Sequence, residues 1–161
     1  MKANNMSESI NQVTLALELI VTFSGVFLAF MLDRVIDWRK EQQAKKELLK
    51  NLSCELNELK NSLTKDAPKL YPDIWDSAVA SGQLELLDSE QLTKLTNVYR
   101  KIKGTDYEGT RVRDAKDAFE ETSSPDARKH YSIQSQAHEK RIEETKALID
   151  EVLNEPWLKS L

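Results

Sequence analysis

Residues 13–32 read VTLALELIVTFSGVFLAFML and form the one stretch of this chain that is apolar enough to cross a lipid bilayer. At about 1.5 Å per residue, a helix of this length spans the roughly 30 Å hydrocarbon core. Its aliphatic and phenylalanine side chains favour insertion by about 4–7 kcal/mol, more than the roughly 2.5–3.5 kcal/mol that a charge such as Glu18 costs at mid-membrane. We therefore expect a transmembrane helix. A central helix of a soluble bundle is the alternative, and a signal peptide is disfavoured because Asp33 and Arg34 follow the segment.

Positive charge is concentrated after this segment, which predicts its orientation. Only Lys2 and the terminal amine precede it, whereas six cations follow it: Arg34, Arg39, Lys40, Lys45, Lys46 and Lys50. Loops rich in lysine and arginine stay in the cytoplasm. We expect a single-pass protein of the cytoplasmic membrane, with a short extracytoplasmic tail (1–12), a transmembrane helix (13–32), a juxtamembrane helix (33–66) and a cytoplasmic helical domain (67–161).

Beyond the membrane the apolar pattern is helical. Leucines recur at intervals of three and four residues, at Leu49, Leu52, Leu56, Leu59 and Leu63. This spacing predicts one buried helix face, either as the core of a bundle or, less favoured because it lasts barely two heptads, as an intermolecular coiled coil. The fold class is therefore all-α, with one N-terminal transmembrane helix that continues into a small cytoplasmic antiparallel helical bundle.

Turn and cap residues divide the rest of the chain into helices. A helix from Pro72 to Gly82 is expected to bury Ile74, Trp75, Ala78 and Val79. Residues 88–91 (DSEQ) are typical of a helix start, and 123–125 (SSP) predict a turn before a last helix over 126–153. Glycines at 104 and 109 bracket the polar residues TDYE and predict a loop or a helix break there.

Composition argues against several classes of function. The chain carries 23 Lys and Arg against 27 Asp and Glu, a net charge of −4, which disfavours nucleic acid as a partner. Cys54, His130 and His138 are the soft metal-ligand candidates, and their spacing matches no metal motif. The histidines are expected to be solvated or hydrogen-bonded at the surface. We therefore expect no enzyme activity, no catalytic or metal-binding residue, no cofactor and no small-molecule substrate.

Two features are candidates for binding a protein partner. On a helix the small and polar residues of the apolar segment share one face, namely Glu18, Thr22, Gly25, Ala29 and Asp33. Small residues allow close helix approach, and an ionisable group in a span usually faces protein, so we expect this stripe to dock on another membrane helix. The alternative is a solitary anchor. The second candidate is the apolar C-terminal tail, Trp157, Leu158 and Leu161, which is expected to insert into a pocket of its own domain or of a partner.

The run from Trp75 to Ile102 resembles a pattern found in many small single-span proteins of bacteria and archaea, none of them characterised. It is carried by Trp75, Ala78, Ser81, Gly82, Leu84, Leu86, Leu87, Glu90, Leu92, Leu95, Tyr99 and Ile102. In layout the chain is also similar to a type of small methanogen protein that attaches to the membrane-bound tetrahydromethanopterin:coenzyme M methyltransferase complex. That resemblance implies an accessory, protective or inhibitory subunit near a corrinoid and a sodium path.

The sequence thus predicts a membrane-anchored, non-enzymatic accessory or regulatory subunit. Its expected partners are the lipid bilayer and a larger integral membrane complex. The alternative is a homo-oligomeric single-span membrane scaffold that uses the same stripe between identical helices.

Overall fold

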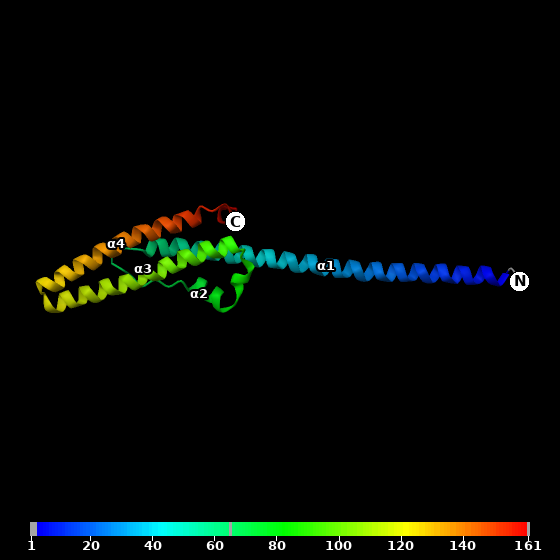
Figure 1. Cartoon of the computed structure of the whole chain (residues 1–161), viewed down its shortest axis with the longest axis horizontal. Helices are drawn as coiled ribbons and strands as arrows, with labels where there is room; N and C mark the ends of the chain where they lie inside the picture. Colours follow the sequence, from blue (N-terminus) through cyan, green and yellow to red (C-terminus); the bar gives the residue numbers. More distant parts are fainter. Residues whose placement is uncertain (1–2, 65, 161) are drawn as a thin grey trace. The chain divides into compact units, whose positions relative to one another are not determined.

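A computed structural model describes the backbone of residues 3–64 and 66–160, and the side chains of these residues from Glu18 onward. All the secondary structure in these ranges is helical, which confirms the all-α prediction. The α-helices are α1 (Ala3–Ser62), α2 (Asp73–Ala80), α3 (Ser89–Thr122), α4 (Pro125–Leu153) and α5 (Pro156–Lys159), and a 3₁₀ helix, η1 (Gln83–Leu86), follows α2 (Figure 1).

The chain divides into two units, residues 1–43 and 44–161. In the first unit, α1 carries one 18-residue window that is long and apolar enough to cross a membrane, and none of that window is buried. The large apolar side chains of residues 19–36 are all exposed, from Phe23 at 71% to Val35 and Met31 at 46%. Among the residues of this unit whose side chains are described, 18–43, none covers them.

The second unit is a three-helix bundle made by the end of α1, α3 and α4. Ion pairs and hydrogen bonds show the helix directions. Lys45 of α1 pairs with Asp88, the N-cap of α3, and Glu55, further along α1, accepts a hydrogen bond from Tyr99, further along α3, so these two helices run parallel. Helix α4 runs antiparallel to α3, because Lys94 bonds to Glu155 after the end of α4 while Lys101 bonds to Glu144 within it. Figure 1 shows α3 and α4 side by side. The predicted bundle is therefore antiparallel only in part, since residues 63–88 return the chain before α3 begins.

The leucine spacing of α1 forms the core of this bundle. All five predicted leucines are at most 5% exposed, and they pack with apolar residues of the other helices; the main ones are Leu95, Val98, Tyr99, Ile102, Ile142, Ile149 and Val152. In α2, Trp75 and Ala78 are buried as expected, but Ile74 and Val79 are 36% and 52% exposed. The prediction for Ile74 and Val79 was wrong because α2 has only two turns and buries one narrow face, which holds Trp75 and Ala78.

Several helix ends match their predicted chemistry. Asp88 accepts a hydrogen bond from the backbone N–H of Gln91, whose side chain accepts one from the Asp88 N–H, a complete capping box. The N–H of Gln91 and the nearby Lys45 lower the pKa of the Asp88 carboxyl. Gly82 adopts the left-handed conformation after α2 (φ 73°), and the Ser124 hydroxyl caps α4.

The predicted loop at residues 104–109 is wrong, because α3 runs through it without a break. The two glycines serve close packing instead of a turn. A Cβ on Gly109 would lie 3.2 Å from the Ala67 Cβ and 3.3 Å from the His138 ring, and one on Gly104 would lie 3.1 Å from the Arg141 guanidinium. Packing of a neighbour against these positions offsets the roughly 1 kcal/mol by which glycine weakens a helix relative to alanine.

Glu55 is a buried carboxylate that joins three elements of the bundle. It is 4% exposed, and its two oxygens accept hydrogen bonds from the backbone N–H groups of Ile74 (2.6 Å) and Trp75 (3.1 Å) at the start of α2 and from the Tyr99 hydroxyl (2.6 Å). The Trp75 and Tyr99 rings stack with centroids 4.4 Å apart. Burial, and then the bond to Glu55, raise the pKa of Tyr99, so the phenol stays protonated and donates.

We expect the substitution Glu55→Ala to lower the free energy of unfolding by about 2–4 kcal/mol, because it leaves three buried donors without an acceptor. Thermal or urea unfolding, followed by Trp fluorescence, measures the change. The matched control is Glu58→Ala, one turn further along α1 and exposed, which should change the stability by less than about 0.5 kcal/mol. Equal effects of the two substitutions would show that Glu55 does not organise α2.

Candidate functional site

The predicted partner-binding stripe lies on an exposed stretch of α1. Glu18, Thr22, Gly25, Ala29 and Asp33 are all exposed, and no atom lies within 4 Å of a Cβ built on Gly25. The Thr22 hydroxyl donates to the Glu18 carbonyl oxygen of its own helix at 2.8 Å, so its donor is already used. The stripe is therefore a helix face of mostly small side chains that another helix could approach closely, with one carboxylate near each end.

Bulky side chains lie on the opposite side of the same stretch. At about 100° per residue, Phe23, Phe27 and Phe30 lie roughly 120–180° around the helix from Glu18, whereas Gly25 and Ala29 lie within about 20° of it. The three phenylalanines are at least 60% exposed. The helix thus has a thin side suited to close approach and a thick side suited to lipid chains.

The C-terminal tail packs on its own domain. Leu158 of α5 is 7% exposed and belongs to the core, and Trp157 packs against that core. The Glu155 carboxylate, just before α5, binds the Lys94 ammonium at 2.6 Å. Glu155, and then Glu90, raise the pKa of Lys94 and keep it charged. Leu161, the third predicted contact, lies outside the described residues.

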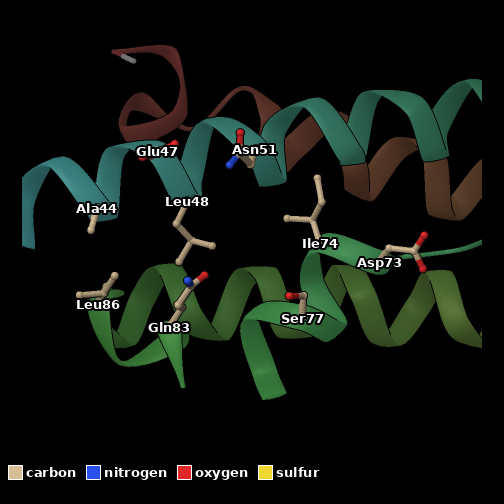
Figure 2. A pocket seen from close by; sticks show the side chains of 9 residues that line it. All are labelled: Ala44, Glu47, Leu48, Asn51, Asp73, Ile74, Ser77, Gln83 and Leu86. Atoms are coloured by element: carbon tan, nitrogen blue, oxygen red, sulfur yellow. The ribbon is translucent and has the colours of Figure 1, made fainter. Parts of the chain in front are cut away.

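A groove lies between α1 and the segment that contains α2 and η1 (Figure 2). Its volume is about 480 Å³. One wall is formed by α1, through Ala44, Glu47, Leu48 and Asn51. The other wall is formed by α2 and η1, through Asp73, Ile74, Ser77, Gln83 and Leu86. Figure 2 shows Leu48 and Ile74 pointing into the space between the two walls, with Asp73 at the end away from Ala44 and Leu86. We call this cavity the α1–α2 groove.

Unpaired carboxylates give the α1–α2 groove its charge. Lys45, at its margin, is already paired with Asp88 at 3.4 Å. Within the part of the chain that the structure describes, the carboxylates of Glu47 and Asp73 form no ion pair or hydrogen bond. The groove therefore combines apolar walls with negative charge that nothing in its own domain neutralises.

His138 differs from its predicted position at the surface. It is 3% exposed, and in the described structure neither of its ring nitrogens has a hydrogen-bond partner of normal geometry. It belongs to the buried face of α4, whose other members follow at intervals of four and three: Ile142, Thr145, Ile149 and Val152. That spacing was visible in the sequence and could have placed His138 in the core. By contrast, His130 is exposed as expected, and the Cys54 side chain is also exposed.

The segment after α1 closes over His138. We call residues 63–64 and 66–72 the strap. Asp106 of α3 accepts from the backbone N–H of Leu70 at 3.0 Å, and Arg113 donates to the carbonyl oxygen of Ala67. Ala67 has φ 51°, a left-handed conformation that is strained for alanine, so these two bonds hold the strap in a shape it would not adopt alone.

Burial lowers the pKa of His138 below its ordinary value of 6.5. The charges that face it act in both directions: Glu108 and Asp106 raise the pKa, Arg113 lowers it, and the Thr64 carbonyl of the strap favours the protonated ring. The neutral ring is thus the form that fits the folded domain.

The folded domain should lose stability as the pH falls through about 6.5, because the unfolded chain then binds a proton at position 138 that the folded domain rejects. Unfolding free energies measured at pH 7.5 and 5.5 test this. His138→Leu should reduce the loss, whereas the control His130→Leu, which changes an exposed histidine, should leave it as in the wild type. An equal loss in all three proteins would assign the pH dependence to other groups.

Among the described residues, no group of three or more His, Cys, Asp or Glu side chains is placed to hold a metal ion. Comparison of the sequence with protein-family models, with curated proteins and with solved structures finds no match.

Proposed function

We propose that this chain is a membrane-anchored, non-enzymatic accessory subunit that docks on a larger membrane protein complex through the Glu18–Asp33 stripe. The observation that carries the proposal is the exposure of residues 19–36 on every side of α1. A helix that is apolar all round needs an apolar environment on all sides, and one docking partner would cover only one of them. Lipid covers the thick side, and a partner helix covers the stripe.

The stripe supports docking in addition to anchoring. Gly25 and Ala29 are spaced as in helix pairs that approach closely in membranes, and nothing in the described structure occupies the space beside Gly25. Glu18 lies on the same side, where contact with protein avoids the cost of facing lipid. The compact domain from Ala44 onward would then lie in the cytoplasm, beside the soluble parts of the same complex.

The proposed orientation can be tested at the single cysteine. Cys54 is exposed on α1 after the basic residues. A membrane-impermeant maleimide should label it in inverted membrane vesicles or after permeabilisation, and not in intact cells. The same reagent on a Cys54→Ser variant gives the background. Labelling in intact cells would show that the orientation is the opposite one. Extraction of the protein by alkaline carbonate would show that the chain does not span the membrane.

The stripe can be tested by widening its thin side. The double substitution Gly25→Leu/Ala29→Leu should lower recovery of co-purifying membrane proteins about fivefold or more, since a helix contact of this kind contributes about 1–2 kcal/mol. The matched control Phe23→Leu/Phe30→Leu changes two residues of the thick side and should leave recovery unchanged. Unchanged recovery with the stripe variant would exclude this face.

A homo-oligomeric scaffold is the second candidate, because Gly25 and Ala29 could equally meet the same residues of an identical helix. Mass measurement of the detergent-extracted protein, expressed without other subunits, separates the two. A defined oligomer that the stripe substitutions dissociate supports the scaffold, and a monomer supports the accessory subunit.

A further inference from the structure

A second cavity adjoins the α1–α2 groove near the start of α2. This cavity has a volume of about 280 Å³ and lies along the next turns of α1, between residues 55–62 and the strap. The two cavities share the lining residues Asp73 and Ile74, so they lie next to each other along α1 with Ile74 between them; we call the pair the channel. All the lining residues belong to the compact unit that begins at Ala44.

Three carboxylates line this channel, and none of them pairs with a cation of its own domain. Glu47 and Glu58 come from α1, eleven residues and about 16 Å apart, and Asp73 comes from the opposite wall. Within the described ranges 18–64 and 66–160, none of the three carboxylates forms an ion pair or accepts a hydrogen bond. Other acidic residues of this domain, such as Asp76, Asp88 and Asp150, do pair with lysines. Lys69, the cation lining the channel, lies over the Tyr71 ring, 5.2 Å from its centroid.

The channel also leaves apolar surface uncovered. Tyr71 is 60% exposed, although the preceding residue Leu70 is buried, and Ile74 is 36% exposed, although the following residue Trp75 is buried. Apolar side chains between separated negative charges fit an amphipathic helix that carries leucine-like residues on one face and lysine or arginine along its edges. The aliphatic stems of such cations would pack on the apolar walls while their charged ends reach the carboxylates.

We propose that this channel binds a lysine- and arginine-rich amphipathic helix from the cytoplasmic juxtamembrane segment of the partner membrane protein. The inference rests on the proposed function, which places this domain in the cytoplasm beside that partner. The segments that flank membrane spans on the cytoplasmic side are enriched in lysine and arginine, so they carry the charge that the channel lacks. An anionic lipid surface has the wrong sign, because it would repel Glu47, Glu58 and Asp73.

The experiment uses the full chain in detergent and a fluorescent synthetic peptide of about 14 residues, made of leucine and lysine with the leucines on one helix face. Fluorescence anisotropy measures binding. The wild type should bind this peptide and not the matched peptide with glutamate in place of lysine. Raising the salt concentration should weaken binding, as expected for partly exposed charges. Absence of binding, or equal binding of the acidic peptide, overturns the proposal.

A pair of charge-matched variants tests the location. The channel variant Glu47→Gln/Glu58→Gln/Asp73→Asn should weaken binding about tenfold or more. The control variant Asp114→Asn/Asp117→Asn/Glu121→Gln removes the same charge from exposed positions of α3 and should bind within about twofold of wild type. Equal weakening by both variants would mean that the peptide responds only to net charge, which contradicts a site in the channel.

Two further variants keep the result interpretable. Glu47→Gln/Glu58→Gln leaves α2 untouched and should still weaken binding severalfold, so a folding defect caused by Asp73→Asn cannot account for the loss. Gly25→Leu/Ala29→Leu should bind the peptide as the wild type does. If the wild type does not bind the peptide but still co-purifies with its partner through the stripe, the channel proposal is wrong and the stripe proposal stands. If the wild type binds the peptide but the stripe variant co-purifies normally, the stripe proposal is wrong and the channel proposal stands.

Cys54 reports where the peptide lies. It follows Asn51 and precedes Glu58 at intervals of three and four residues, so it shares their side of α1. A peptide that carries a maleimide near its middle should cross-link to Cys54 in the wild type and lose this cross-link in the channel variant. Cross-linking that the channel variant leaves unchanged would place the peptide elsewhere. Dissociation of an oligomer by the basic peptide would instead identify a second copy of this chain, with its own basic segment, as the occupant.

Discussion

The position of α2, and with it one wall of the α1–α2 groove, depends on the buried carboxylate of Glu55. A short helix such as α2 has few apolar contacts of its own, and its first N–H groups lack partners within the helix. By accepting from two of these groups and from Tyr99, Glu55 attaches the start of α2 to α1 and α3 at one point. The stacked Trp75 and Tyr99 rings then fill the space beside it. Because α2 is held there, the opposite wall of the α1–α2 groove also has a defined position.

The sequence predicted the parts of the fold that follow from local patterns. The leucine spacing placed the buried face of α1, and the capping box at Asp88 placed the start of α3. Glu55 was missed although it lies three residues after Leu52 and four before Leu59, on the same buried face. An acidic residue inside such a spacing was the available signal. Its interpretation needed α2 as a partner, and α2 is brought there by tertiary structure.

The remaining errors have the same origin. Gly104 and Gly109 are turn residues by local preference, yet in α3 they make room for Arg141 and His138 of α4. The parallel direction of α1 and α3 depends on how residues 63–88 return along the bundle, which no single helix pattern encodes. For the candidate sites, the stripe was visible as a spacing in one helix. The α1–α2 groove was not, because its walls come from segments more than twenty residues apart.

The apolar side chains of α1 are arranged differently in its two parts. Up to Ile36 its large apolar residues point in all directions and remain exposed, whereas from Leu48 to Leu63 they lie on one face and are buried by α3 and α4. A helix that is apolar all round is stable in lipid, and one with a single apolar face is stable against protein in water. The proposed membrane anchor would place the first stretch in lipid and the second in the aqueous domain. This anchor needs such a pattern, with the apolar side chains exposed on every side of the first stretch and confined to one face in the second.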